Sequence, residues 1–562
     1  MVVVSFSKKE LQEKLGLKGT EWQKELGETL FKIGMELESG NSAEEEIEID
    51  IAGAGNRLDT VSLEGLVRVV LAYRGKYSFK YPKLTKAKGA VVNVDKSVAD
   101  VRPYIGNFIV RGIDIDDSTL KRIINLQEKI ASTFGRDRKV LGMGLFKLSQ
   151  LKFPLTYVAL PAEQIKFAPL GFKEEMAGDE ILKKHEKGIA YAHLFSGKNK
   201  LPILRDASGK ILTMPGITNS NDLGKVSVGK QDLFVEATGT NLQMIRQLLA
   251  ANALDFADMG GKIESVAVKY PTNDKVIEFP EWDFEKYSLN LQQANNLLGL
   301  NLTAAQAVQL LKKMMLPAVA KGSQLQVSVP RFRSDIVHWV DLVEDIARAY
   351  GFDSFVPQPP SVHTFGKKHE KTRLFNEIIN SFTGLGFQQV VGMILASKED
   401  QTVRVKKPDD GKFVELYSSR ALGLNCCRRS LYPGLLAIIS SNKQYSYPQK
   451  IFEVGECLEV DTLQETGAKT SWKAAALLAS ADASFAQAKS LVESFGRCLD
   501  DYELKIEPLK EKSPEAALFI LGRAARITGK YFSGTFGEVD IEILRNFGIE
   551  MPCVLIEVEL KQ

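Results

Sequence analysis

The chain has 562 residues, of which 44% are hydrophobic and 25% are charged, and its formal net charge at pH 7 is +3. This length predicts three to four domains with cores of their own, and the composition excludes a disordered or fibrous chain. The nearly balanced charge excludes a global basic field, so any contact with nucleic acid would need a local patch or a partner's charges.

The cysteines and the hydropathy of the chain indicate which cellular environment the protein occupies. The five cysteines include no C-x-x-C pair and no zinc-ligand spacing, which predicts reduced thiols in packing roles. No apolar run approaches the ~18 residues of a membrane span, and no signal-peptide segment follows Met1. We therefore expect a soluble cytoplasmic protein with no membrane contact.

Residues 1–85 predict an N-terminal α+β domain. Helical spacing of apolar residues covers 11–15 and 22–33, and 45–51 alternates like a half-buried strand. Ser62 is placed to cap the helix that follows it.

Residues 86–275 predict a mixed α/β domain in which strands dominate. Two helical patterns, 118–134 and 241–259, interrupt the strands. In the strand Leu233-Phe234-Val235-Glu236, alternation places Phe234 and Glu236 on the same face.

Residues 276–356 predict a small helical domain. Thr303 and Gln306 form a capping box before an apolar helical run. Pro357-Gln358-Pro359-Pro360 cannot continue a helix or an inner strand, so we predict a domain boundary there. Residues 361–562 then form the last domain, which begins with a helix over 375–387.

Four carboxylates in the small helical domain could gather around one divalent cation. On a helix Asp341, Glu344 and Asp345 would share one side, and Asp335 lies just upstream. Carboxylate oxygens suit Mg²⁺. The alternative is a solvated helix face with Glu344 paired to Arg348, and spacing alone favours that alternative.

The residues around these four carboxylates favour the metal site over the solvated helix face. The run Arg-x-Arg-x-Asp-Ile over 331–336, followed by Asp-Leu-Val-Glu-Asp-Ile-Ala-Arg-Ala-Tyr-Gly-Phe over 341–352, resembles the small winged-helix-like domain of phenylalanyl-tRNA synthetase beta subunits. Segments 56–68, 193–240 and 427–436 resemble further motifs of these subunits, in the same order. The chain is thus similar to the archaeal or eukaryotic-cytosolic form of that family.

This resemblance implies ligands, partners and a fold. Asp335, Asp341, Glu344 and Asp345 would hold Mg²⁺, although the family more often has Glu at position 345. The partner would be an alpha subunit in an (αβ)₂ heterotetramer that charges tRNA(Phe) with ATP as substrate. Residues 361–562 would form a class II synthetase-like antiparallel sheet domain without catalytic residues, in which we interpret Arg428 as structural.

The resemblance also implies that 86–275 is an editing domain. Glu236 would accept the phenol of a wrongly attached tyrosine, and Asn219 and Ser220 would orient the ester or the attacking water. Gly216 and Thr218 depart from the family's pattern in one pocket wall. His193 is interpreted as a hydrogen-bonded core residue, and the alternative for Glu236 is an ordinary strand-end glutamate.

Two other functions compete with a synthetase subunit. One is a free-standing hydrolase that clears mischarged tRNA, which would not need the long 361–562 region. The other is a non-enzymatic nucleic-acid-binding scaffold built on the small helical domain. A stoichiometric alpha partner would separate the first hypothesis from both.

Overall fold

The computed structural model describes residues 3–38, 45–51, 56–224, 226–271, 275–362, 364–419, 421 and 423–561. The chain is a mixed α/β multidomain protein that divides into two compact units, 1–359 and 360–562. The division lies in the proline-rich segment where the sequence predicts a boundary. The predicted divisions inside the first unit, after residues 85 and 275, stay predictions.

The first unit begins with a three-stranded sheet covered by helices. Its strand order is β1-β3-β2, with β1 at Val3–Ser7, β2 at Glu36–Leu37 and β3 at Glu46–Asp50. The helices are α1 (Lys8–Leu15), α2 (Trp22–Lys32) and α3 (Leu63–Tyr73). Ser62 caps α3 as predicted, because its hydroxyl accepts a hydrogen bond from the Gly65 amide at 3.0 Å.

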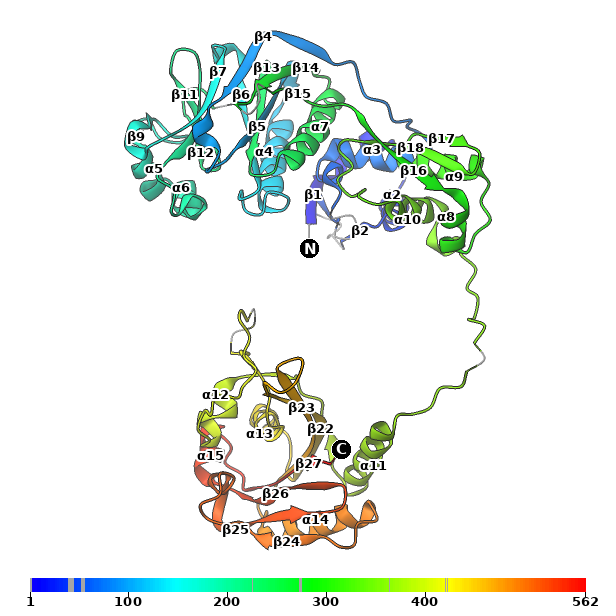
Figure 1. Cartoon of the computed structure of the whole chain (residues 1–562), viewed down its shortest axis with the longest axis vertical. Coiled ribbons are helices and arrows are strands. Elements are labelled where there is room, and N and C mark those ends of the chain that lie inside the picture. The colour runs from blue at the N-terminus through cyan, green and yellow to red at the C-terminus, as the bar shows by residue number, and fades with distance from the viewer. Residues whose placement is uncertain are drawn as a thin grey trace. The chain divides into compact units, whose positions relative to one another are not determined.

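A ten-stranded sheet follows and carries the largest part of the core. Its order is β12-β11-β10-β7-β4-β14-β5-β13-β6, and β15 also pairs with β14. The strands are β4 (Thr85–Val94), β5 (Tyr104–Ile115), β6 (Leu141–Lys147), β7 (Leu155–Leu160), β10 (Leu201–Arg205), β11 (Ile211–Met214), β12 (Thr218–Asn219), β13 (Gly229–Gly239), β14 (Lys262–Lys269) and β15 (Val276–Phe279). Helices α4 (Asp117–Ser132) and α7 (Leu242–Asp258) pack against it (Figure 1).

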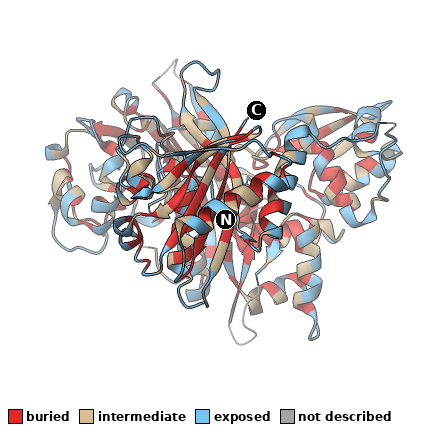
Figure 2. Cartoon of the chain, turned by 90° about the horizontal axis from the view of Figure 1, so that it is seen from below, coloured by how far each residue is buried: buried red, intermediate tan, exposed pale blue. Residues whose placement is uncertain are grey.

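Two short strands and two short helices extend this sheet region. They are β8 (Lys166–Phe167), β9 (Met176–Ala177), α5 (Gly178–Lys184) and α6 (Glu186–Tyr191). They lie in the connection between β7 and β10, and β9 leads directly into α5. Leu233, Val235 and Ala237 of β13 are fully buried, and Figure 2 shows how the buried residues concentrate along the strands.

The last part of the first unit combines a three-stranded antiparallel sheet with three helices. The sheet has the order β16-β18-β17, and its elements are β16 (Phe284–Asn290), α8 (Leu291–Leu298), α9 (Ala304–Lys313), β17 (Ala318–Lys321), β18 (Gln324–Pro330) and α10 (Trp339–Tyr350). The predicted capping box of α9 is present, since Thr303 and Gln306 exchange hydrogen bonds with each other's backbone amides. Whether this region is a winged helix stays a prediction.

The second unit is a seven-stranded sheet with helices on both faces. The order is β19-β22-β23-β27-β26-β25-β24, antiparallel except for the β19–β22 pair. Its strands are β19 (Gln388–Gln389), β22 (Gln449–Val460), β23 (Ala468–Ala479), β24 (Lys505–Pro508), β25 (Phe519–Thr528), β26 (Phe532–Val539) and β27 (Cys553–Leu560), and a separate pair is β20 (Leu395–Ala396) with β21 (Cys426–Cys427). Its helices are α11 (Glu370–Gly384), α12 (Lys398–Gln401), α13 (Tyr432–Ser441), α14 (Phe485–Cys498) and α15 (Ile541–Asn546).

Alternation along β23 shows how this second sheet is covered. Ala475 and Leu477 belong to a core shared with α13 and α15, whereas Ala474 and Ala476 belong to a core shared with α11 and α14. Helix α11 begins five residues before the predicted start at 375 and ends at Gly384. Its first turn is charged, so the apolar periodicity used for the prediction does not reach it.

Among the described residues, no helix is long and apolar enough to cross a membrane.

Candidate functional site

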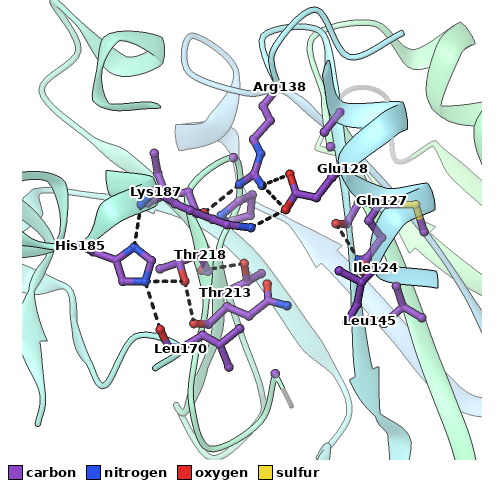
Figure 3. Close-up of a pocket in the computed structure, with 18 of the residues that line it drawn as sticks. Ile124, Gln127, Glu128, Arg138, Leu145, Leu170, His185, Lys187, Thr213 and Thr218 are labelled. Atoms are coloured by element: carbon purple, nitrogen blue, oxygen red, sulfur yellow. Dashed lines mark hydrogen bonds and ion pairs between the residues drawn. The ribbon is translucent and has the colours of Figure 1, made fainter. Parts of the chain in front are cut away.

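A cavity of about 970 Å³ lies beside β6, an edge strand of the large sheet. One wall comes from α4 and the other from the segment between β8 and α6 together with 213–219. In the close-up, Ile124 and Glu128 of α4 lie across the cavity from Leu170 and His185 (Figure 3). The cavity therefore depends on segments that are far apart in the chain.

Glu236 reaches this cavity from β13. The register places Asn107 of β5 directly opposite it on one flank and Gly144 of β6 on the other. A Cβ at Gly144 would lie 2.8 Å from Glu236 Oε1, so the missing side chain makes room for the carboxyl group. Glu236 is 3% exposed, and its Oε2 has no hydrogen-bond partner. An unpaired buried carboxyl oxygen lowers the stability of the fold.

Burial dominates the electrostatics of Glu236. It raises the pKa of the carboxyl to about 8, and the nearby Arg102 guanidinium opposes this shift without reversing it. Arg102 donates its hydrogen bonds elsewhere, to the hydroxyl and carbonyl oxygens of Thr238 and to the Arg138 carbonyl. Glu236 is therefore largely protonated at neutral pH.

We expect Glu236→Gln to stabilise the fold at pH 8 but not at pH 4. Between the usual glutamate pKa of 4.5 and the raised value of about 8, the folded chain keeps a proton that the unfolded chain has lost. The free energy of unfolding of the wild type therefore falls as pH rises through this window, on the order of 2–4 kcal/mol in total. Melting temperatures of both proteins at pH 4, 6 and 8 check this, and an equal difference at all three values would contradict it.

Asn219 and Ser220 are placed differently. Asn219 is half-buried and lines the cavity. Ser220 is buried, is not among the lining residues, and its hydroxyl accepts a hydrogen bond from the Leu223 amide at 3.2 Å. The structure thus brings Glu236 and Asn219 to one cavity and gives Ser220 a turn contact.

A cluster of charged side chains borders the cavity. Glu128 accepts hydrogen bonds from Arg138 at 3.1 Å and from Lys187 (Figure 3). Arg138 also lies over the Tyr191 ring, 4.4 Å from its centroid. Arg138 is the last of three consecutive residues with φ between 47° and 65°, a strained backbone that persists only where the surroundings hold it.

His185 contributes to the wall opposite α4. Its Nδ1 accepts a hydrogen bond from the Lys187 amide at 3.1 Å, while Nε2 lies 3.1 Å from the Leu170 carbonyl. These contacts fit a neutral ring that carries its proton on Nε2. Thr218, one of the two departures in the predicted pocket wall, lies 3.5 Å from the same Nε2. The other departure, Gly216, has φ +87°, which favours glycine.

Sequence reasoning missed Asn107, Arg102 and His185. Nothing in their local pattern separates them from ordinary polar residues, because they meet Glu236 or the cavity only through sheet register and loop packing. The interpretation of His193 as a core residue is wrong, since that side chain is exposed and its Nδ1 lies 3.0 Å from the Ala190 carbonyl.

The predicted acidic cluster surrounds an arginine. Arg333 is 2% exposed and pairs in a bidentate manner with Asp335, at 2.8 and 2.6 Å, and with Asp345 at 2.6 Å. Burial alone would raise the pKa of Asp335, but the guanidinium holds it below its usual value. Two of the four carboxylates are therefore already paired with one guanidinium.

The other two carboxylates have separate contacts. Asp341 Oδ2 accepts hydrogen bonds from the Val337 and His338 amides at 2.8 and 2.7 Å, which caps α10. Glu344 pairs with Arg348 at 2.7 Å, as the solvated-face alternative predicts. Asp345 differs from Asp341 and Glu344 in being buried.

This arrangement does not form a four-carboxylate cage. Among the described residues, no group of three or more His, Cys, Asp or Glu side chains is placed to hold a metal ion. The partly exposed Asp341 and the exposed Glu344 remain compatible with a magnesium ion held through one or two carboxylates and several waters.

Arg428 lies in the second unit and is buried. Its guanidinium donates to Glu453 Oε1 at 2.6 Å and to the Glu456 carbonyl at 2.9 Å. These buried contacts support the structural interpretation of Arg428, which stays a prediction.

Comparison with known proteins decides the family. The profile described as "Phenylalanyl tRNA synthetase beta chain CLM domain" matches residues 356–560, and that described as "tRNA synthetase B5 domain" matches 287–352. A phenylalanine–tRNA ligase beta subunit from Methanocella arvoryzae is 35% identical over 541 residues, covering 95% of each chain. The chain belongs to the phenylalanine–tRNA ligase beta-subunit family.

Two further relatives are beta subunits of the same ligase. The beta subunit of Korarchaeum cryptofilum is 33% identical over 100% of this chain and 99% of its own. A crystal structure of an N-terminal fragment of the Pyrococcus horikoshii beta subunit is 34% identical and covers 62% of this chain and 99% of that fragment, with a TM-score of 0.58. The predicted family is thus confirmed, and the relatives named here are archaeal.

Proposed function

We propose that this beta subunit hydrolyses Tyr-tRNA(Phe) in the cavity beside β6 and supports the attachment of phenylalanine to tRNA(Phe) by an alpha subunit. The observation that carries the hydrolytic role is the Glu236 carboxyl, which is buried at the cavity with one oxygen unpaired. A volume of about 970 Å³ is ample for an aromatic amino acid and part of the terminal nucleotide.

The proposed discrimination follows from the desolvated state of Glu236. A tyrosine phenol would give the Glu236 carboxyl a hydrogen-bond partner, whereas phenylalanine would leave the carboxyl without one inside an occupied cavity. Sites built to hydrogen-bond a substrate hydroxyl reject the analogue that lacks it more strongly than apolar pockets distinguish a methylene. Correct Phe-tRNA would therefore be spared.

Asn219 and Ser220 stay proposed to orient the ester or the attacking water. Asn219 lines the cavity, so its amide can reach a bound ester. Ser220 would act through the backbone turn that it holds with Leu223.

For aminoacylation we propose an (αβ)₂ heterotetramer in which the alpha subunit binds ATP. The purified chain with ATP, phenylalanine and tRNA(Phe) should form no Phe-tRNA, and adding the alpha subunit should restore charging. Robust charging by the chain alone would overturn this assignment. If no alpha subunit binds but Tyr-tRNA is still hydrolysed, the chain is a free-standing hydrolase.

Magnesium at α10 is a separate proposal. Replacing Glu344 by Gln should weaken the Mg²⁺ dependence of docking to the alpha subunit while leaving α10 folded, because the residue is exposed and glutamine is a good helix former. Calorimetric titration of Mg²⁺ with and without the alpha subunit measures this. Asp341→Asn is a less clean test, since it also disturbs the α10 cap. An unchanged Mg²⁺ response in Glu344→Gln would leave the solvated-face interpretation.

A further inference from the structure

Asn107 is a buried polar side chain that has no role in the proposed editing reaction. It is fully buried on β5, and both its Nδ2 and its Oδ1 lack hydrogen-bond partners. A buried carboxamide with neither end satisfied is rare in folded proteins and calls for a specific reason.

The place of Asn107 in the sheet supplies that reason. It lies directly opposite Glu236 in the β5–β13 ladder, so both side chains project from the same face. Glu236 Oε1 occupies the space over Gly144 on the β6 flank, while Asn107 stands on the other flank. Two neighbouring side chains thus have unpaired polar atoms, and the Asn107 carboxamide offers both a donor and an acceptor to the Glu236 carboxyl.

The other polar side chains near Glu236 are already engaged. Arg102 donates to Thr238 and to the Arg138 carbonyl. The Tyr157 hydroxyl donates to the Arg102 carbonyl at 2.7 Å. Among these neighbours, Asn107 is the one whose N–H groups have no partner.

We propose that Asn107 is a positioning residue for the selection of tyrosine, acting through Glu236. Its amide fixes the plane of the Glu236 carboxyl when substrate enters, so that one oxygen stays directed at the phenol. Without it the carboxyl could rotate within the space left by Gly144, and the hydrogen bond to the phenol would lose its geometry. This inference rests on the proposed editing function.

A double-mutant cycle on the assembled enzyme tests the inference. The four proteins are wild type, Asn107→Leu, Glu236→Ala and the double variant, and the readout is the ratio of kcat/KM for deacylation of Tyr-tRNA and Phe-tRNA. We expect Asn107→Leu to lower this ratio roughly three- to tenfold in the wild type and not at all in Glu236→Ala. Asn295→Leu is the matched control, since Asn295 is a buried asparagine of α8 whose amide donates to the Leu302 carbonyl at 3.0 Å, and neither residue lines the cavity.

The pH profile of the same ratio separates positioning from a structural role. An amide donor favours the ionised carboxyl, so Asn107→Leu should move the midpoint governed by Glu236 to higher pH. Arg102 acts on the pKa of Glu236, and Glu236 in turn acts on that of Tyr157; both neighbours are unchanged in the variant. A merely structural role would lower the rate without moving the midpoint.

The outcomes distinguish this inference from the proposed function. If Glu236→Ala leaves Tyr-tRNA hydrolysis unchanged, the role proposed for Glu236 is wrong, and the inference about Asn107 loses its basis. If Glu236→Ala impairs selection but Asn107→Leu has no effect, or has the same effect in both backgrounds, the role of Asn107 is overturned. An equal loss in Asn295→Leu would also overturn it, because the effect would then reflect the fold.

Discussion

Replacing Glu236 by alanine is expected to lower the rate of Tyr-tRNA(Phe) hydrolysis by the assembled enzyme about ten- to hundredfold, with phenylalanylation unchanged. The variant removes the hydrogen-bond partner of the phenol, which is worth roughly 1.5 kcal/mol for a neutral carboxyl and up to about 3 kcal/mol for an ionised one. Because burial raises the pKa of Glu236 to about 8, the effect should grow from the lower to the upper limit as pH rises past that value.

The same change should let phenylalanine enter the cavity more readily. With alanine at position 236, no desolvated carboxyl remains to be left unpaired by an apolar ring. Hydrolysis of correct Phe-tRNA should therefore rise while hydrolysis of Tyr-tRNA falls. Loss of both activities together would indicate a damaged cavity instead of lost selection.

Deacylation of preformed Tyr-tRNA and Phe-tRNA measures both changes. Glu264→Ala is a suitable control, because Glu264 lies on β14 of the same sheet, pairs with Arg111 at 2.8 Å and is not among the residues that line the cavity. Equal Tyr-tRNA hydrolysis by wild type and Glu236→Ala would show that Glu236 is only a strand-end residue. The hydrolytic site would then have to be sought around Asn219.

Replacing Arg333 by methionine is expected to destabilise the first unit by about 3–5 kcal/mol. The change leaves Asp335 and Asp345 buried beside each other without their shared cation, and removing one partner of a buried ion pair costs far more than an exposed pair contributes. Arg333 also donates to the Met314 carbonyl at 2.9 Å, so the segment after α9 loses a contact as well. Lowering the pH should recover part of the loss, since protonating the carboxyls removes their repulsion.

Arg331→Met is the matched control for this prediction. Arg331 is two residues away and pairs with Asp283, whose side chain is 52% exposed, so its loss should cost less than about 1 kcal/mol. Thermal unfolding together with hydrogen exchange of the α10 amides reports on both variants. A similar small loss in the two would mean that Arg333 is not the centre of this cluster.

Local sequence was sufficient for most individual elements. The capping box at Thr303 and the cap at Ser62 mark helix starts, and both are found, because capping depends on residues within one turn. Alternation placed Glu236 and Phe234 on one face of β13, since the period of a strand is local. The start of α11 was misplaced where a charged first turn, beginning at Glu370, carries no apolar signal.

Tertiary structure alone decided which side chains meet. The register of β13 sets Glu236 between Asn107 and Gly144, and neither neighbour lies within ninety residues of it in the chain. The acidic cluster shows the same limit: helical spacing grouped Asp341, Glu344 and Asp345, but burial of α10 turns Asp345 toward Arg333 and leaves Glu344 exposed. Residue types and periodicity determine which groups are available and which face they occupy. Pairing between distant strands and the cost of burying charge determine whether those groups form an unsatisfied recognition site or a closed ion cluster.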